Sequence, residues 1–377
     1  MRRTLVLPLL SLLLLLGGCA DQPSWTPPPA FDGAADATLD DRWKVYASGA
    51  RQVALLPDCA PRRVEPVPGV PLRGTVLLLH GYSACPQQYF ELAERLATRG
   101  YRSLIPLLPG HGRARRADGS DDVSGLPTGG TWRASFDAYA QALNTIMRSA
   151  TGERILVGLS GGGATALHTA LAAPALYDRL LVLSPFFDVA APALVNVAIA
   201  VAGATPGLRA LDATPFGSER KCLEKVAQGK ASYCEWQLRH VRGMHALGQS
   251  VARRLLASPY TGGVQFVGVE GDKSVSAQRI RRVMLAHDGP GASACFYPAG
   301  VPHSMFSRFD HPGEDMYWLE DFHAAALAFI GEGRRFPTAG PSAVLAPVGR
   351  CRLERQESVG LERSSRASGM ARPDRGF

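Results

Sequence analysis

The sequence lacks the patterns that mark a zinc protein, a repeat protein or a nucleic-acid-binding protein. It has no C-x-x-C pair and no cluster of His and Cys, so no metal site is expected. It has no internal repeat. The formal net charge is +8, but Arg2, Arg3 and the arginine-rich segment from Gly331 onward carry most of it. The rest of the chain holds only about +2 and no basic stripe with interleaved aromatics, so no nucleic-acid partner is expected.

A membrane-spanning helix is also missing at the N-terminus, where the apolar stretch from Leu5 to Leu16 is shorter than the ~20 residues required. Two arginines precede it, as in a signal peptide. The Leu-Gly-Gly-Cys sequence at residues 16–19 resembles a bacterial lipobox, in which the cysteine is lipidated. We therefore predict a lipoprotein signal peptide at residues 1–18 and lipidation of Cys19. An ordinary signal peptide that ends near a cysteine is the alternative.

The segment after Cys19 is rich in Pro, Ala and Asp and predicts a tether at residues 19–41. The expected location is the bacterial cell envelope, on the periplasmic face of a membrane. Ala20, rather than an acidic residue, favours the outer membrane over the inner one. At the other end, residues 332–377 lose apolar periodicity and fill with Arg, Ser, Gly and Pro, so we predict a disordered tail.

Short apolar segments alternate with helical patterns between residues 42 and 331. Near-continuous apolar strands separated by helices predict an α/β fold, with a mostly parallel sheet covered by helices on both faces. The core of this fold is expected in residues 42–187 and 260–331. The expected strands lie at residues 74–81, 101–109, 154–160, 178–186, 263–272 and 292–300, and the expected helices at 87–98, 132–149, 164–172, 276–287 and 316–330.

A break in this alternation predicts an inserted helical cap at residues 188–259, where no strand candidate appears. One stretch of the segment is uncharged, but two prolines, an asparagine and a glycine interrupt it. A membrane crossing here would also place the two halves of one sheet on opposite sides of a bilayer. The cap should therefore fold over the carboxyl edge of the sheet. Its apolar face either belongs to the core or also lines an acyl pocket.

Six cysteines remain besides Cys19, and an oxidising compartment permits disulfides among them. Cys222 and Cys234 lie in a polar segment typical of a surface loop, and we predict a bridge between them. Cys295 lies in an apolar run and is expected to be a small core residue.

Ser160 lies in the sequence GLSGGG, between a buried strand and an Ala/Leu-rich helix. A sharp strand-to-helix turn needs residues without a Cβ, and this is the G-x-S-x-G pattern of a nucleophile elbow. Flanking glycines are common by chance in a chain with 40 of them, so the interpretation needs independent support.

A nucleophilic serine needs a base and an orienting acid, in the order Ser, acid, His. His303 follows Ser160 and lies in a Gly/Pro-bounded loop after the last expected strand. His311 comes later, His323 falls within the final helix, and His168 is expected to pack on the helix after the elbow.

Asp272 directly follows the preceding strand and is the predicted acid. An N-cap role in the next helix is the alternative for this residue. Asp188, one strand earlier, is the rival acid.

An oxyanion hole requires backbone N–H groups from the residue after the nucleophile and from the loop after an early strand. These residues are Gly161 and Tyr82. His80, immediately before a glycine at a strand end, is expected to anchor that loop.

Together these residues resemble an α/β-hydrolase of the esterase, monoacylglycerol lipase and lysophospholipase branch. The resemblance rests on HGYS at 80–83, LLPGHG at 107–112, GLSGG at 158–162, GD at 271–272 and PH at 302–303. It implies that the cap follows the sixth strand of that fold and that the G-H-G loop shapes the site. The H-G-G-G motif of hormone-sensitive-lipase-like esterases is missing.

The resemblance implies a membrane-tethered serine hydrolase that cleaves short- to medium-chain acyl esters, such as monoacylglycerol-like or lysophospholipid-like lipids. Ser160, His303 and Asp272 would form the triad, without a cofactor or metal. Two alternatives stay open. The chain could be a non-catalytic lipid-binding or scaffold lipoprotein on the same fold, or the triad could act on a thioester, a C–C bond or a peptide. The sequence does not indicate an oligomeric state.

Overall fold

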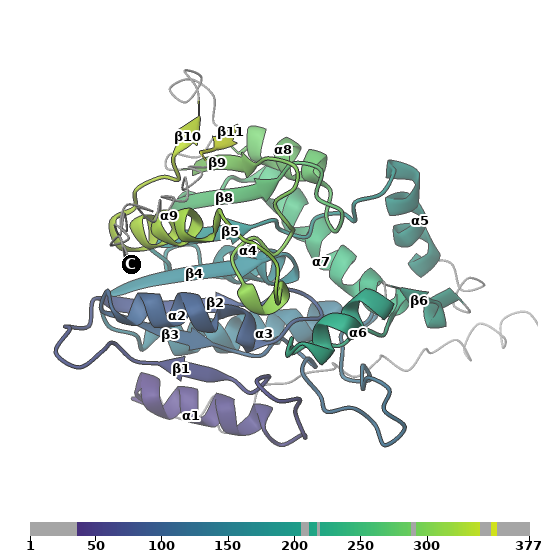
Figure 1. The fold of residues 1–377 in the computed structure, drawn as a ribbon, viewed down its shortest axis with the longest axis horizontal. Helices are drawn as coiled ribbons and strands as arrows, with labels where there is room; N and C mark the ends of the chain where they lie inside the picture. The colour runs from purple at the N-terminus through teal and green to yellow at the C-terminus, as the bar shows by residue number, and fades with distance from the viewer. Residues whose placement is uncertain (1–35, 205–210, 217–218, 288–291, 340–347, 353–377) are drawn as a thin grey trace, which may run out of the picture.

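A nine-stranded sheet forms the centre of the computed structural model (Figure 1). Its strand order is β1-β3-β2-β4-β5-β8-β9-β11-β10. The edge strands β1 and β10 run antiparallel to their neighbours, and every other pair in this sheet is parallel. The predicted α/β class with a mostly parallel sheet is confirmed. The structure describes residues 36–204, 211–216, 219–287, 292–339 and 348–352.

The elements of the described chain are named in sequence order. The strands are β1 (Arg62–Val64), β2 (Gly74–Leu79), β3 (Tyr101–Ile105), β4 (Glu153–Leu159), β5 (Arg179–Leu183), β6 (Pro215–Phe216), β7 (Trp236–Gln237), β8 (Gly263–Val269), β9 (Ala292–Tyr297), β10 (Thr338–Ala339) and β11 (Val348–Cys351). The α-helices are α1 (Leu39–Ala50), α2 (Phe90–Ala97), α3 (Trp132–Arg148), α4 (Gly161–Ala172), α5 (Ala193–Ala204), α6 (Glu219–Ala227), α7 (Leu238–Ala257), α8 (Ala277–Leu285) and α9 (Leu319–Glu332).

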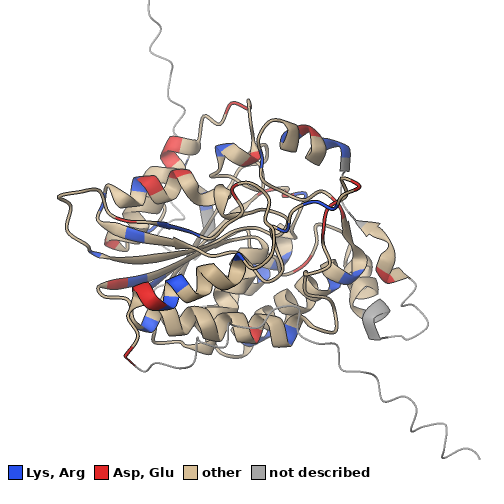
Figure 2. Ribbon diagram, turned by 90° about the horizontal axis from the view of Figure 1, so that it is seen from below, with Lys and Arg blue, Asp and Glu red and all other residues tan. Residues whose placement is uncertain are grey.

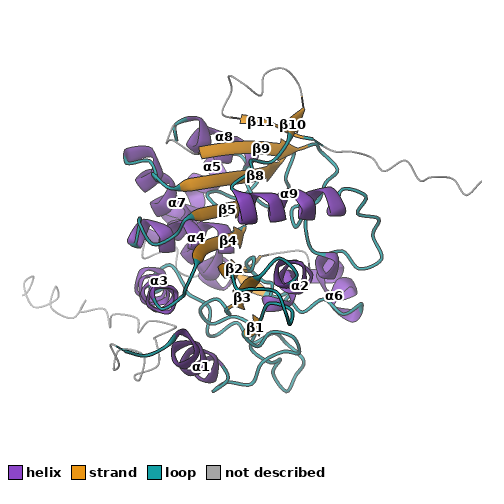
Figure 3. Cartoon of the chain, turned by 90° about the vertical axis from the view of Figure 1, so that its left-hand side faces the viewer, coloured by secondary structure: helices purple, strands orange, loops and turns teal. Residues whose placement is uncertain are grey.

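Helices cover both faces of the sheet, because successive side chains of each strand point to opposite sides. In β2, Leu77 and Leu79 belong to one core, while Val76 and Leu78 belong to the other. Residues of α1, α3, α4, α7 and α8 fill the first core, and residues of α2 and α9 fill the second. Figure 3 shows these two sets of helices on opposite sides of the strands. The four consecutive residues 76–79 of β2 are all fully buried, as expected of a central strand that is covered on both faces.

Helix α1 begins inside the segment 19–41, for which the sequence predicts a tether. Thr38 caps it: its hydroxyl accepts the backbone N–H of Asp41, and the Asp41 carboxylate accepts the N–H of Thr38. Trp43 and Tyr46 of this helix are buried in the core. The folded domain therefore starts a few residues before residue 42. The predicted signal peptide at 1–18 and Cys19 lie outside the described residues.

The insertion at 188–259 contains α5, β6, α6, β7 and α7 and lies between β5 and β8 in the chain. Figure 1 shows α5, β6 and α6 to one side of the sheet. The prediction that this segment holds no strand is wrong, because β6 and β7 form a short antiparallel pair. Each has only two residues, which is too short for a periodic sequence signal. None of the helices in the described ranges combines the length and the apolar character needed to span a membrane.

The C-terminal segment 332–377 is predicted to be disordered, and the described portion of it is not. Strand β11 pairs with β9 in parallel, and β10 pairs with β11. A disulfide joins Cys351 of β11 to Cys295 of β9, so Cys295 is a buried half-cystine rather than a free core residue. The pairing of β11 with β9 depends on residues about 55 positions earlier in the chain, so the local sequence around β11 shows no periodic pattern. A second disulfide joins Cys59 to Cys85.

Charged residues are interspersed over the described elements, as Figure 2 shows. Many of them form ion pairs with neighbouring side chains. One example is Arg95 of α2, which pairs with Glu91 of its own helix and with Glu320 of α9. Such pairs connect neighbouring helices on the surface and contribute little each to stability.

Candidate active site

Ser160 occupies the sharp turn between β4 and α4. Its backbone has φ 55° and ψ −117°, a conformation that is costly for a residue with a side chain. The turn is held by the Ser160 N–H, which donates to the Leu183 carbonyl at 2.8 Å. A Cβ at Gly158 would overlap the Gly162 carbonyl oxygen, and one at Gly162 would overlap the Leu79 carbonyl oxygen. The glycines are therefore required for the close approach of strand and helix.

Asp272 and His303 lie in the loops after β8 and β9. The His303 Nδ1 is 2.6 Å from the Asp272 Oδ2. The other carboxylate oxygen of Asp272 accepts backbone N–H groups from Ser274 and Val275, at 2.8 and 3.1 Å. The Asp272 side chain is 1% exposed and that of His303 is 21% exposed, so the carboxylate is fixed while the imidazole reaches an open space.

The charge state of Asp272 follows from these contacts. Burial raises its pKa, but the charge of His303, the hydrogen bond from its ring and the two backbone N–H groups lower it by more. The net shift is downward, so the carboxylate is ionised at neutral pH and orients the His303 ring with Nδ1 as the donor. The alternative N-cap role belongs to Ser276, whose hydroxyl accepts the N–H of Arg279 at the start of α8.

The other candidate residues have different partners. Asp188, the rival acid, accepts from His245 and Gln249 of α7 and forms an ion pair with Arg279. His168 contacts Asp137 at 2.8 Å, and His323 contacts the Phe306 carbonyl at 3.1 Å. Asp188, His168 and His323 therefore take part in hydrogen bonds and ion pairs elsewhere, and none of the three lines the cavity that holds Ser160.

Ser160 and His303 line one cavity of about 280 Å³. Tyr82, Phe186 and Trp236 contribute its aromatic side. The elbow after β4 and the loop after β9 therefore open to the same space. This is the arrangement expected of residues at the carboxyl ends of parallel strands.

Tyr82 and Gly161, the predicted oxyanion-hole residues, are in close contact. A Cβ at Gly161 would lie 3.0 Å from the Cβ of Tyr82 and 3.1 Å from the Cε of Met244. The Tyr82 ring stacks on Trp236, with ring centroids 5.0 Å apart, and meets His111 edge-on. These rings fix the position of the Tyr82 backbone beside the elbow.

His80 anchors this loop, as its position predicts. Its Nδ1 contacts the Gly81 carbonyl at 2.9 Å, and its Nε2 accepts the Leu108 N–H at 3.1 Å. Burial lowers the pKa of His80 to about 4, so the ring is neutral and can accept that hydrogen bond at neutral pH. The G-H-G loop is also tightly packed: a Cβ at Gly110, which has φ +72°, would overlap the Gly125 carbonyl.

Polar side chains that no sequence pattern predicts line one side of the cavity. We call this side, formed by Gln88, Lys225, Lys230, Ser304 and Asp310, the polar wall. The buried Asp310 carboxylate accepts from Gln88 and Ser304 and forms an ion pair with Lys230 at 3.1 Å. Lys225 of α6 also lines the cavity and donates to the Asp310 carbonyl at 2.9 Å. No local pattern connects these residues, because they come from segments far apart in the chain.

A disulfide joins Cys222 of α6 to Cys234, just before β7. It links two segments of the insertion that border the cavity, since Lys225 and Trp236 lie close to its two ends in sequence and both line the cavity.

Within the described ranges, one group of side chains has the spacing of a metal site: Glu91, Glu320 and His323. Arg95 forms ion pairs with both carboxylates, at 3.1 and 2.6 Å. The group connects α2 to α9 and shares no residue with the lining of the Ser160 cavity. We therefore describe it as an ion-pair network.

Solved structures with a similar fold include lipolytic enzymes. One of the metagenome-derived lipolytic enzymes LipS and LipT is 20% identical, with a TM-score of 0.50, and the match covers 73% of this chain and 98% of that chain. A monoacylglycerol lipase from Paleococcus ferrophilus is 17% identical, with a TM-score of 0.53 and coverage of 73% and 99%. A thermostable carboxyl esterase from Bacillus coagulans is 11% identical, with a TM-score of 0.52 and coverage of 72% and 93%. At these identities the likeness concerns the fold.

A comparison with curated proteins found no significant sequence match. Residues 70–288 match the family described as serine aminopeptidase, S33. This region is more than half of the chain and contains the elbow, the Asp272 loop and the insertion. Together with the parallel sheet and the Ser160 turn, the match shows that the chain belongs to the serine aminopeptidase S33 family of α/β-hydrolases.

Proposed function

We propose that this protein is a membrane-tethered serine hydrolase that cleaves carboxylic esters. The observation that carries the proposal is the 2.6 Å contact between Asp272 and His303 at a cavity that also holds Ser160 in a strained elbow. A buried carboxylate, an oriented imidazole and a serine in a sharp turn are the groups that nucleophilic acyl transfer requires.

In the proposed reaction, the Ser160 Oγ attacks the ester carbonyl and its proton passes to the His303 Nε2. Asp272 keeps the proton on Nδ1 and stabilises the imidazolium that forms. The tetrahedral intermediate then breaks its bond to the alcohol oxygen, which takes the proton from His303. Water attacks the acyl-serine in the second half and loses a proton to His303. The second tetrahedral intermediate then breaks its bond to the Ser160 Oγ, which takes that proton back from His303. The products are a carboxylic acid and free enzyme.

The backbone N–H groups of Tyr82 and Gly161 are the proposed donors to the oxyanion. Each such donor stabilises the transition state by roughly 3 kcal/mol, because it is already aimed at the developing charge. The close contact between the two residues supports a shared binding point for one oxygen atom.

The proposed substrates are small acyl esters, with monoacylglycerol-like and lysophospholipid-like lipids as the main class. Two features of the cavity support this choice: aromatic side chains for an acyl group and the polar wall around Lys225 and Lys230 for a hydroxylated head. A monoacylglycerol lipase and a carboxyl esterase among the similar folds agree with it. Attachment through Cys19 would place the cavity near the lipid that it acts on.

Active-site labelling tests the proposal. A fluorophosphonate probe should label the wild-type protein and fail to label a Ser160→Ala variant of equal thermal stability. Hydrolysis of p-nitrophenyl butyrate should fall by a factor of about 10⁶ in the same variant, which is about the loss in kcat when a nucleophilic serine is removed. Unchanged labelling of the variant would refute the mechanism. Tight binding of fatty acids without any hydrolysis would favour the non-catalytic alternative.

Membrane attachment has a separate test. Wild-type protein expressed in a bacterial host should partition into the detergent phase of Triton X-114 and incorporate labelled palmitate. A Cys19→Ser variant should do neither. Equal incorporation by the two proteins would refute lipidation at this residue.

The family match favours a second candidate, hydrolysis of aminoacyl peptides by the same triad. Aminoacyl p-nitroanilides and p-nitrophenyl esters of matched size separate the two activities. A higher kcat/KM for the anilide would favour the peptidase.

A further inference from the structure

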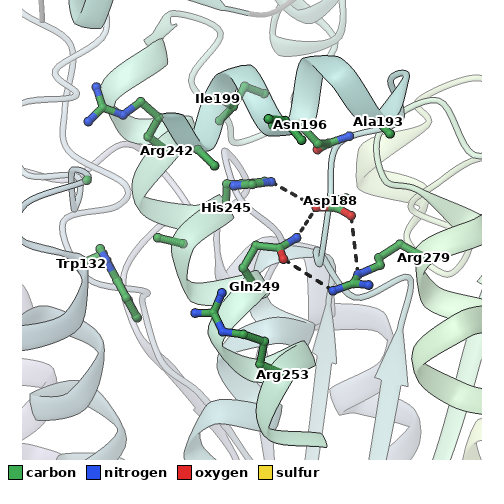
Figure 4. Close-up of a pocket in the computed structure, with 14 residues that line it drawn as sticks. Trp132, Asp188, Ala193, Asn196, Ile199, Arg242, His245, Gln249, Arg253 and Arg279 are labelled. Carbon is green, nitrogen blue, oxygen red and sulfur yellow. Dashed lines mark hydrogen bonds and ion pairs between the residues drawn. The ribbon is translucent and has the colours of Figure 1, made fainter. Parts of the chain in front are cut away.

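A second cavity, of about 580 Å³, lies between α5 and α7. Its volume falls within the range of about 300–1,000 Å³ that small-molecule sites occupy. It shares no lining residue with the cavity that holds Ser160. Figure 4 shows its side chains, which come from α5, α7, the start of α3, the loop after β5 and the start of α8. The mechanism proposed above uses none of them.

Helix α7 separates the two cavities. Met244 points to the elbow, where it would contact a Cβ on Gly161. The next residue, His245, lines the second cavity, as do Gln249 and Arg253 further along the helix. The spacing of four residues places these three side chains on one helical face. The second cavity, which we call the chamber, is therefore distinct from the cavity that holds Ser160.

One wall of this chamber is apolar. Helix α5 contributes Ala193, Val197 and Ala200 at a spacing of three and four residues, together with Ile199. Trp132 at the start of α3 also lines the cavity. Such a wall suits an aliphatic chain, because burying apolar surface contributes about 25 cal/mol per Å².

Three arginines also line the chamber. Arg242 is paired with Asp212, and Arg279 is paired with Asp188 at 3.6 Å. Arg253 has no hydrogen-bond or ion-pair partner among the described residues, and no dashed line reaches it in Figure 4. The charged groups around the cavity therefore leave one positive charge uncompensated.

The guanidinium group of Arg279 can donate more hydrogen bonds than it makes. Its side chain is 17% exposed, and its buried Nε–H faces the Asp188 Oδ2 at 3.6 Å, an ion pair that is too long for a hydrogen bond. Its single hydrogen bond, to Gln249, is 3.5 Å long. Leaving a buried donor unpaired is costly, and native structures usually pair such groups. A ligand carboxylate that reaches Arg279 from the cavity would give its guanidinium group a further acceptor.

We propose that this chamber binds an amphiphilic carboxylate, with the carboxylate at the arginines Arg253 and Arg279 that line it and the aliphatic chain along α5. The single uncompensated positive charge matches a monoanion, and guanidinium groups bind carboxylates through paired hydrogen bonds. The acid released in the proposed hydrolysis is a ligand of this class. The binding itself does not depend on that reaction.

Calorimetric titration of the purified protein with decanoate, decanol and acetate tests the proposal. Decanoate should bind saturably. Decanol and acetate should each bind at least about tenfold more weakly, because one lacks the charge and the other lacks the chain. Equal affinity for decanoate and decanol would overturn the proposal.

Substitutions locate the site. Arg253→Gln and Arg279→Gln should each weaken decanoate binding by roughly tenfold or more. Arg282→Gln, an exposed position on α8 outside the lining, is the matched control and should bind like the wild type. If Arg279→Gln fails to fold, the decanoate affinity of Arg253→Gln tests the proposal alone, because Arg253 has no partner to lose among the described residues. Wild-type affinity in Arg253→Gln would overturn the proposal.

Tryptophan fluorescence separates this chamber from the catalytic cavity. Decanoate should change the emission of the wild type, and Trp132→Phe should lose that change while it keeps its affinity. A change that persists in Trp132→Phe would place the ligand elsewhere and overturn the proposal. Failure of ester hydrolysis would leave these binding results as they are, so the two proposals can fail separately.

Discussion

The Nδ1 of His303 and the Oδ2 of Asp272 lie 2.6 Å apart, although they belong to loops after different strands. Two backbone N–H groups hold the other oxygen of the same carboxylate. The imidazole is therefore oriented by a side chain that cannot easily turn away. Asp188 lies one strand earlier and is bound to α7 and α8 instead.

This difference predicts opposite results for two Asp-to-Asn variants. Asp272→Asn should lower kcat for an ester by roughly 10³- to 10⁴-fold, because the amide favours the wrong tautomer of His303. Asp188→Asn is the matched control and should keep kcat near the wild-type value. Steady-state kinetics with p-nitrophenyl butyrate measures both. A loss in Asp188→Asn equal to that in Asp272→Asn would contradict the assignment.

Tyr82 should act through its backbone, not its hydroxyl. The hydroxyl is buried without a hydrogen-bond partner among the described residues. Tyr82→Phe should therefore leave kcat unchanged and unfold at the same or a higher temperature, since an unpaired buried polar atom costs about 1–3 kcal/mol. Tyr46→Phe is the control: its hydroxyl donates to Leu107 at 2.7 Å, and its loss should cost about 1 kcal/mol. A large fall in kcat for Tyr82→Phe would assign a role to the hydroxyl.

The buried Asp310 predicts an acid-dependent loss of stability. Burial raises the pKa of Asp310, but the charge of Lys230 and hydrogen bonds from Ser304, Gln88 and Lys230 lower it to about 2. The ordinary value is 3.8, so folding is favoured by about 2 kcal/mol while the unfolded carboxyl is ionised. This contribution is fully present well above pH 3.8 and is lost as the pH falls through about 2.

Urea unfolding of the wild type and Asp310→Asn at several pH values measures this contribution. The difference in unfolding free energy should be about 2 kcal/mol at neutral pH and should shrink as the pH falls from about 4 to about 2. A difference that stays constant over that range would mean that the carboxyl is not the source of the stabilisation.

The sequence predicted those features of the fold that have a local signal. Apolar runs marked the parallel strands β2, β3, β4, β5, β8 and β9, and glycines marked the Ser160 elbow, because each depends on residues close together in the chain. The loops that carry Asp272 and His303 followed from the rule that such residues gather at strand ends. The Cys222–Cys234 disulfide was also predicted, from two cysteines in one short polar segment.

Features that depend on distant contacts were missed. Strand β11 has no apolar alternation, and its place in the sheet comes from pairing with β9 and a disulfide to Cys295. The Asp310 cluster joins Gln88, Ser304 and Lys230 across long stretches of sequence. Tertiary contacts of this kind leave no periodic trace.

The elbow predicts a sharp difference between two Gly-to-Ala variants. A Cβ at Gly162 would overlap the Leu79 carbonyl oxygen, so β2 and α4 would have to separate. Gly162→Ala should therefore lower the melting temperature and abolish ester hydrolysis. In Gly263→Ala the nearest atom would be 3.4 Å away, and the effect should stay within about 0.5 kcal/mol. Wild-type activity in Gly162→Ala would contradict the tight packing of this turn.

The disulfides of the described residues close loops of different length, which ranks the Cys295–Cys351 and Cys222–Cys234 bridges by their contribution to stability. The Cys295–Cys351 bridge spans 56 residues and the Cys222–Cys234 bridge spans 12. In the chain-entropy account, a bridge stabilises by restricting the unfolded chain, by about 4 kcal/mol for the longer loop and about 3 kcal/mol for the shorter one. Replacing both cysteines of a pair with alanine and measuring guanidinium unfolding gives each contribution.

The double variant at 295 and 351 should also unpair β11 from β9, visible as faster hydrogen exchange at Arg350, whereas the variant at 222 and 234 should leave this exchange unchanged. If loss of the Cys222–Cys234 bridge lowers the free energy of unfolding by more than loss of the Cys295–Cys351 bridge, the contribution of the bridges comes from folded-state contacts around α6 and not from the unfolded chain.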